Sequence, residues 1–172
     1  ELMDIKETIE KASLKFYKGT LEGKDIVLVR CGIGKVNSAL CAQILIREFD
    51  VDAIVNTGVA GALHSELDVL DMVISTDAIQ YDVDTTAFGD PKGTIPRMES
   101  SVFVADEKLI NAAYESSIKE MKSNKVLKGR VATGDIFISS KELKEELVNN
   151  PHLYYVIAGN GKLTDYYKEY IH

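Results

Sequence analysis

The stretch that decides the fold runs from residue 26 to residue 37 and reads IVLVRCGIGKVN. Its first four residues are apolar on both faces, which is typical of a central strand in a buried sheet. Gly32 and Gly34 then predict a tight turn, because glycine allows close backbone approach. The helix predicted next covers residues 36–49 and has an apolar stripe at positions i, i+4 and i+8, formed by Val36, Leu40 and Ile44.

The rest of the chain continues the alternation of strands and helices, which predicts an α/β fold. The polar stretch 82–97 predicts a long loop. We expect an α/β domain over residues 1–149 and an atypical tail, a strand and a short helix, over residues 150–172. Strands are expected at residues 15–17, 25–30, 53–56, 72–75, 131–132 and 153–158. Further helices are expected from an Asp106 cap to about residue 122, at 141–149 after a Ser139/Glu142 capping box, and at 163–171.

The composition limits the classes of function. The chain has 172 residues, of which 45% are hydrophobic, and a net charge of -7, which disfavours general attraction to nucleic acid or anionic membranes. Two cysteines, Cys31 and Cys41, are too few for a disulfide framework, and the three histidines are too scattered to predict a metal site. No apolar run reaches the roughly 18 residues that span a bilayer, and the first residues have no signal layout. We therefore expect a cytoplasmic protein that binds neither nucleic acid nor membrane.

Four turns follow one another along the chain: GIGKVN at residues 32–37, NTGVAG at 56–61, DVDTTAFG at 82–89 and TGDIFI at 133–138. Three of them lie at predicted strand ends, where open α/β sheets bind ligands. The first turn alone lacks the full spacing of a P-loop or a dinucleotide fingerprint. In this order, however, the set resembles the 5′-methylthioadenosine/S-adenosylhomocysteine nucleosidases of the purine nucleoside phosphorylase-like superfamily, from Thr8 to Asn149.

This resemblance implies a mixed central sheet flanked by helices, incomplete in this chain, and a homodimer. It implies hydrolysis of the N-glycosidic bond of 5′-methylthioadenosine and S-adenosylhomocysteine, with release of adenine. In such enzymes an Asp protonates the leaving base at N7, one Glu activates the attacking water, and a second Glu holds the ribose hydroxyls, which is general acid–base logic. The implied partner is a small purine thio-nucleoside, with no metal and no organic cofactor.

The resemblance also implies a set of substrate-binding residues. Gly61 is expected beside the ribose and base, with Val59 and Ala60 in the same wall. Phe137 and Ile138 are expected to sandwich the adenine, and the Ile138 backbone to read its edge. Ile33 is expected to contact the side of the 5′-substituent. Phe88 and Pro96 are expected to reach across a dimer interface and help form the alkylthio pocket.

The resemblance does not extend to the catalytic carboxylates. The family's Gly-Ala-Met-Glu-Glu, Val-Glu-Met-Glu-Gly-Ala and Ala-Ile-Ser-Asp segments have no counterpart in these 172 residues. Glu1–Asp4 is matched instead to the helix that follows the first of them. Residues 150–172 resemble a piece of the nucleotide-sugar domain of a GT-B glycosyltransferase. The catalytic residues therefore stay unassigned, and this chain is expected to be impaired as an enzyme.

Two other functions stay open. One is a non-catalytic purine-nucleoside-binding or interaction protein. The other is phosphorolysis, for which Arg30 beside the first glycine turn is the candidate phosphate ligand, although a solvated charge at a strand end explains it as well. Structural alternatives also stay open for several site residues. Phe137 could be a core side chain, Phe88 and Pro96 could pack a loop, and Val59 and Ala60 fit any tight strand exit. Asp135 is expected to hydrogen-bond its own turn.

Overall fold

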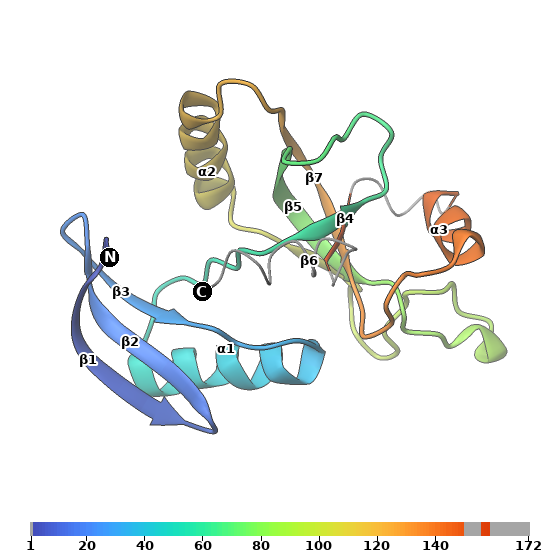
Figure 1. The fold of residues 1–172 in the computed structure, drawn as a ribbon. Coiled ribbons are helices and arrows are strands. Elements are labelled where there is room, and N and C mark those ends of the chain that lie inside the picture. The colour runs from blue at the N-terminus through green and yellow to red at the C-terminus, as the bar shows by residue number, and fades with distance from the viewer. Residues whose placement is uncertain (1, 150–155, 159–172) are drawn as a thin grey trace. The chain divides into compact units, whose positions relative to one another are not determined.

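The computed structural model describes residues 2–149 and 156–158. The chain divides into two compact units, Glu1–Thr57 and Gly58–His172. Each unit has a sheet and a buried cluster of its own, and Figure 1 follows the chain from β1 in the first unit to α3 in the second. The domain boundary that the sequence predicts after residue 149 stays a prediction.

The first unit is built on an antiparallel meander. Strands β1 (Asp4–Lys11), β2 (Leu14–Leu21) and β3 (Lys24–Val29) pair in chain order, as the curved ribbon in Figure 1 shows. Both reversals are two-residue turns with positive φ angles, whose twist matches that of the flanking strands. The sequence predicts β3 to within one residue and part of the first half of β2, residues 15–17, but it misses β1.

Helix α1 (Lys35–Phe49) follows β3 through the glycine turn. Gly34 precedes the helix with a φ of 96°, which residues with a Cβ rarely adopt. Asp50 ends the helix in the left-handed conformation, to which aspartate is better suited than most residues. The strand, turn and helix predicted from residues 26–49 are thus confirmed as elements. The central position predicted for the strand is wrong, because β3 is an edge strand of the described three-stranded sheet. The helix also buries Cys41 and Leu45 instead of the predicted stripe, in which Val36 and Leu40 are exposed.

The core of the first unit lies between its sheet and α1. Phe16 of β2 is fully buried and packs with Cys41 and Leu45 of the helix. Its ring also stacks on Phe49, with 5.0 Å between the ring centroids. Burial, with a smaller contribution from Cys31, raises the pKa of the Cys41 thiol, so this cysteine is a core side chain rather than a reactive thiolate.

Two predictions for the first sixty residues are wrong. The segment 53–56 forms no strand, and its side chains are exposed, with 43% of Ile54 and 73% of Val55 accessible. An apolar run becomes a strand only where a neighbour pairs its backbone, and pairing begins beyond this run, at β4 (Ala60–Ala62). The helix match for the first four residues also fails, because β1 begins at Asp4.

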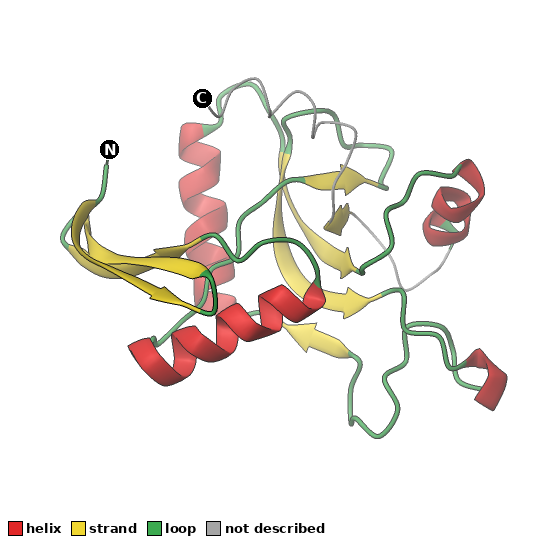
Figure 2. Ribbon diagram, turned by 60° about the horizontal axis from the view of Figure 1, so that its bottom comes forward, coloured by secondary structure: helices red, strands yellow, loops and turns green. Residues whose placement is uncertain are grey.

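The second unit is built on a mixed sheet whose order, among the described residues, is β4-β8-β7-β5-β6. β7 pairs in parallel with β5 and β8, whereas β4 and β6 pair antiparallel at the two edges. Figure 2 shows the long central arrows of this sheet with their heads toward the same side. The α/β fold with a mixed sheet is therefore confirmed. The strands β5 to β8 run Met72–Gln80, Val102–Val104, Val126–Thr133 and Val156–Ala158.

Helix α2 (Glu107–Glu120) begins where the sequence predicts. The Asp106 carboxylate accepts a hydrogen bond from the Leu109 N–H at 2.9 Å, which satisfies one of the free donors of the first turn. The N-cap predicted from residue 106 is confirmed.

Helix α3 (Lys141–Val148) is also confirmed, but its cap lies one residue later than predicted. The Ser140 hydroxyl, not that of Ser139, accepts from the Leu143 N–H at 3.1 Å. Ser140 has the extended backbone of an N-cap, so the neighbouring serine stays outside the helix.

The core of the second unit lies at the carboxyl ends of β5 and β7. Ile79, Tyr81, Ala132 and Leu147 are buried there, and Leu147 brings α3 onto the sheet. The long loop predicted for residues 82–97 is confirmed as the connection between β5 and β6, with one short 3₁₀ turn, η1 (Thr86–Phe88). Of the predicted strand 153–158, residues 156–158 form β8; residues 153–155 and the predicted helix 163–171 lie outside the described residues.

Candidate functional site

One end of the second unit's sheet brings several predicted site segments together. The backbone pairings place Gln80, Thr133, Ala158 and Ala60 in one row across four adjacent strands. The chain segments that leave this row are residues 81–82 after β5, the turn 134–138 after β7 and residues 58–59 before β4. The carboxyl ends of parallel strands are where open α/β sheets place ligand sites. This row is the candidate site, and we call it the strand-end row.

The turn 134–138, which we call the base turn, is tied to the end of β5. The Tyr81 N–H donates to the Thr133 carbonyl at 3.0 Å, and the Asp135 N–H donates to Asp82 Oδ2 at 2.8 Å. The Tyr81 hydroxyl donates to the carbonyl of Ile136 in the middle of the turn. Tyr81 and Asp82, which directly follow β5, therefore hold the end of β7 at Thr133 and the backbone of the base turn at residues 135 and 136.

Gly134 is required at the start of the base turn by close packing. A Cβ at this position would lie 2.6 Å from Cε1 and 2.8 Å from Cζ of Tyr81, and 2.9 Å from Cγ of Asp82. Those distances are shorter than any ordinary carbon contact. The glycine thus lets the base turn press directly against the Tyr81 ring.

Tyr81 is held in its donor form. Its ring is 3% exposed, and burial raises the pKa of its hydroxyl, with further increases from the Asp82 and Asp135 carboxylates. Both causes disfavour a phenolate, because a second negative charge in this place would be desolvated and repelled. The hydroxyl therefore stays protonated well above neutral pH.

The base turn presents Phe137 outward. Phe137 is 52% exposed, whereas Ile138 is half-buried and packs against the core cluster around Ile79. The structural alternative of Phe137 as a core side chain is therefore wrong. An exposed aromatic ring next to a well-fixed backbone is suited to stacking on a planar ligand.

The expected ribose wall lies on β4 and the residue before it. Val59 is 48% exposed, Ala60 is exposed and stands in the strand-end row, and Gly61 is half-buried one residue further along the strand. The predicted residues Val59, Ala60, Gly61, Phe137 and Ile138 all belong to segments that begin or end at this row.

The loop after β5 carries the two residues expected at a dimer interface. The Asp84 carboxylate accepts from the Thr86 N–H at 3.0 Å and hydroxyl at 2.7 Å, and these bonds lower the pKa of Asp84. They shape the short turn that ends at Phe88, whose side chain is 88% exposed. Pro96, farther along the loop, is exposed as well.

Ile33 and Arg30 belong to the first unit. The Asn37 Nδ2 donates to the Ile33 carbonyl at 2.6 Å, which tightens the turn before α1, and the Ile33 side chain is 72% exposed. Arg30 is exposed after the end of β3. Their part in a nucleoside or phosphate site stays a prediction.

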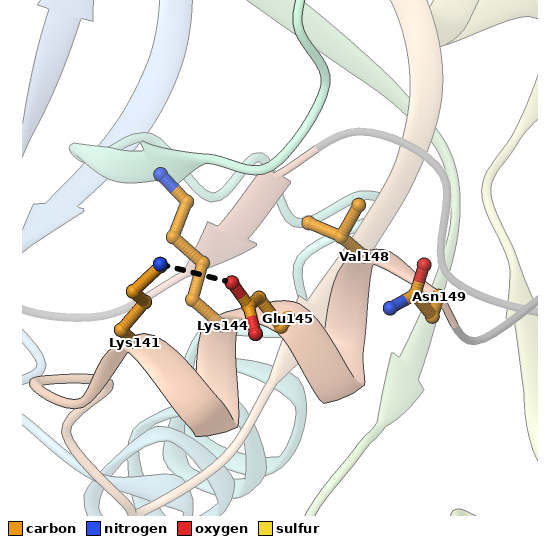
Figure 3. Close-up of a pocket in the computed structure, with 5 residues that line it drawn as sticks. All are labelled: Lys141, Lys144, Glu145, Val148 and Asn149. Atoms are coloured by element: carbon orange, nitrogen blue, oxygen red, sulfur yellow. Dashed lines mark ion pairs between the residues drawn. The ribbon is translucent and has the colours of Figure 1, made fainter.

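A hollow of about 550 Å³ lies beside α3, apart from the predicted residues. Figure 3 shows the described residues that line it, with Lys141 and Glu145 joined in an ion pair at 3.5 Å. Because both side chains are well exposed, this pair adds little stability. The described residues of the lining all belong to α3 and its C-cap, and none of them is aromatic: Lys141, Lys144, Glu145, Val148 and Asn149.

Sequence reasoning missed Tyr81 and Asp82 as anchors of the site. A tyrosine that follows an apolar strand looks like ordinary core, and the aspartate looks like a loop residue. Their role depends on which strand pairs with β5, which is β7, some fifty residues later in the chain. From the sequence, the only indication that these segments belong to one site is that the family motifs include both residues 82–89 and residues 133–138.

The comparisons with known proteins agree with this geometry. The family model described as the phosphorylase superfamily matches residues 1–155. The chain belongs to the phosphorylase superfamily. Among superfamily members, a 5′-methylthioadenosine/S-adenosylhomocysteine nucleosidase of Anoxybacillus flavithermus is 46% identical over 74% of this chain and 54% of its own length. The resemblance predicted from the four turns is therefore confirmed.

Solved structures of superfamily members also match. The nucleosidase of Neisseria meningitidis in complex with methylthio-immucillin-A is 35% identical, with a TM-score of 0.82 over 91% of this chain and 67% of that one. The nucleosidase of Colwellia psychrerythraea in complex with adenine is 36% identical, with a TM-score of 0.83 over 91% and 64%. The chain spans about half the length of the curated superfamily relatives that it matches, 54% for the first of them.

Within residues 2–149 and 156–158, none of the helices is long and apolar enough to cross a bilayer. Nor does that part of the chain bring together three or more His, Cys, Asp or Glu side chains in a group that could bind a metal ion.

Proposed function

We propose that the protein is a nucleosidase that hydrolyses the N-glycosidic bond of 5′-methylthioadenosine and S-adenosylhomocysteine and releases adenine. The observation that carries the proposal is the base turn, which is fixed at residues 135 and 136, leaves Phe137 exposed and starts at the strand-end row to which Ala60 also belongs. The names of the relatives, and the adenine and immucillin ligands of their structures, support this assignment.

We propose that the base binds at the turn after β7. Phe137 offers a face for stacking on adenine, and Ile138, which is held by the core, offers backbone groups at a fixed height beside it. Backbone hydrogen bonds discriminate a purine edge only if the turn does not move, and the anchors at residues 81–82 supply that rigidity.

We propose that the ribose lies along Val59, Ala60 and Gly61. Small side chains here leave room for the sugar to approach the backbone, as the open space around Gly61 allows. The Ile33 turn is proposed to contact the 5′-thio substituent, for which an exposed apolar side chain is chemically suited.

The chemistry needs three carboxylates: an acid for the departing base, a base for the attacking water and a ligand for the ribose hydroxyls. The motifs that carry them in the family are not found in these 172 residues. General acid or base assistance contributes about 10²–10⁴-fold for each group. We therefore propose that a polypeptide of these residues alone binds the nucleoside but cleaves it slowly.

A second copy of the chain is proposed to complete the alkylthio side of the site. Phe88 is 88% exposed on its short turn, and Pro96 is exposed on the same loop. A large exposed aromatic side chain on a shaped loop is suited to insertion into a partner's apolar pocket.

Release of adenine from 5′-methylthioadenosine, together with calorimetric titration of adenine, tests the proposed function. We expect adenine to bind, and Phe137→Ala to weaken it by about tenfold or more, since stacking of a base on an aromatic ring contributes about 1–3 kcal/mol. Hydrolysis should be detectable but slow. Binding without any hydrolysis would favour the non-catalytic binder, and no binding of either ligand would refute both functions.

A further inference from the structure

We propose that Tyr81, with Asp82 as a second anchor, is a positioning residue: its hydroxyl latches the base turn in the conformation that receives the purine ring. The inference rests on the proposed function, because it assigns a role within the same site. It does not require these residues to touch the substrate.

The Tyr81 hydroxyl binds the base turn directly beside the residue proposed to stack on the purine. Its acceptor, the Ile136 carbonyl, directly precedes Phe137 in the chain. Rotation about the backbone between these residues is what would swing the Phe137 ring, and a hydrogen bond on that carbonyl resists it. The bond from the Asp135 N–H to Asp82 holds the preceding residue of the turn.

The ring and the hydroxyl of Tyr81 do different things: the ring packs in the core, and the hydroxyl binds the base turn. The Tyr81 ring belongs to the buried cluster with Ile79, Ala132 and Leu147, so it supports the fold. The hydroxyl points out of this cluster to the turn. Replacing Tyr81 by Phe keeps the ring and removes only the hydroxyl, which allows positioning to be measured apart from packing.

The hydrogen bond from Tyr81 should increase the affinity for adenine by limiting the conformations of the base turn. A turn that moves among several conformations binds its ligand more weakly, in proportion to the fraction of time spent in the competent one. Loss of one intramolecular hydrogen bond typically costs about 1 kcal/mol, which corresponds to roughly fivefold in an equilibrium constant. The latch is therefore expected to strengthen adenine binding by between about threefold and tenfold.

Tyr81→Phe tests the latch, with Tyr114→Phe as the matched control. Tyr114 is half-buried on α2, where its ring contacts the Lys128 ammonium, and it belongs to neither β5 nor the base turn. Adenine affinity is measured by calorimetry, and mobility of the turn by hydrogen exchange of a peptide that covers residues 134–138. We expect Tyr81→Phe to raise the adenine Kd by about threefold to tenfold and to speed exchange of this peptide by a similar factor.

The control should change neither quantity. If Tyr81→Phe lowers thermal stability but leaves the adenine Kd and the exchange of residues 134–138 unchanged, the residue is merely structural and the inference is overturned. If the wild-type chain fails to bind adenine, the proposed function fails; faster exchange in the variant would then still support the latch itself, and unchanged exchange would refute it.

A second variant keeps the inference testable if Tyr81→Phe does not fold. Asp82 is half-buried, and Asp82→Ala removes the acceptor of the Asp135 N–H without disturbing the aromatic ring. The same two measurements should change in the same direction, by about twofold to fivefold. Unchanged exchange and unchanged adenine affinity in this variant would contradict the role of the strand end as an anchor.

Discussion

The two units of the chain relate their cores to their glycine turns in different ways. In the first unit, Phe16, Cys41 and Leu45 form a core between sheet and helix, while the turn around Gly34 is stabilised locally by Asn37 and Ser38 of the following helix. In the second unit, a core residue itself reaches into the turn, through the Tyr81 hydroxyl.

This difference separates stability from binding. A core defect in the first unit should cost folding energy and leave the base turn as it is. A defect at the junction of β5 and β7 should cost both folding energy and adenine affinity, because one side chain serves both. The following predictions test this distinction.

The largest effect is expected for Phe16→Ala. Phe16 is fully buried, and removing a buried phenylalanine typically costs about 3–5 kcal/mol of stability, including the cavity left behind. Denaturant unfolding followed by hydrogen exchange of peptides from residues 14–49 would measure the loss. Val55→Ala in the same unit is the control: its side chain is 73% exposed, and its truncation should change stability by at most about 0.5 kcal/mol. Equal losses in the two variants would contradict the described core.

Gly134→Ala should have the next largest effect on stability. Its Cβ would lie 2.6 Å from the Tyr81 ring, so either the ring or the base turn has to move, at a cost of about 1–3 kcal/mol. Adenine affinity should fall as well, in contrast to Phe16→Ala. Gly58→Ala is the control, because a Cβ there meets no atom within 4 Å. A Gly134→Ala protein with normal stability and normal adenine binding would show that the turn is not pressed against Tyr81.

Asp106→Ala should lower stability by about 1 kcal/mol through loss of the α2 cap. Ser140→Ala should do the same for α3, whereas Ser139→Ala should be nearly neutral, since only Ser140 caps the helix. Thermal unfolding of the three variants would distinguish them. A larger effect from Ser139 than from Ser140 would restore the capping position predicted from the sequence.

The stability of the folded chain is expected to depend weakly on pH through Asp71, which lies outside the candidate site. The Asp71 carboxylate accepts the Asp68 and Lys125 N–H groups at 2.9 and 2.8 Å, and these two bonds hold its pKa below the usual range. A lowered carboxyl pKa stabilises the folded state at neutral pH, and this contribution is lost as the pH falls below about 4. Asp71→Asn should therefore be less stable than wild type at pH 7, with the gap closing in acid. A gap that stays constant down to pH 2 would contradict this assignment.

The sequence predicts local features of this fold better than pairings between distant segments. The apolar run 26–29 and the glycines at residues 32 and 34 identify β3 and α1, and Asp106 identifies the start of α2, because each signal acts over a few residues. The strand expected at 53–56 fails for the opposite reason: its formation depends on a pairing partner, which a single apolar run does not reveal.

For the candidate site, too, local features are predicted from the sequence and contacts between distant segments are not. The motif at residues 133–138 indicates the base turn from its family resemblance, and the structure adds why the turn is rigid. The Tyr81 and Asp82 anchors arise from the parallel pairing of β5 with β7 and from the contact at Gly134, which no local pattern encodes. The sequence therefore predicts where a base would bind, but not what holds the binding turn in place.

Amide chemical shifts recorded by NMR during titration of adenine test the site most directly. We expect the largest shifts in the base turn, residues 134–138, with smaller ones at Tyr81, Asp82 and the segment 59–61 that shares the strand-end row. Shifts confined to the hollow beside α3, or no shifts at saturating adenine, would contradict a purine site at the base turn.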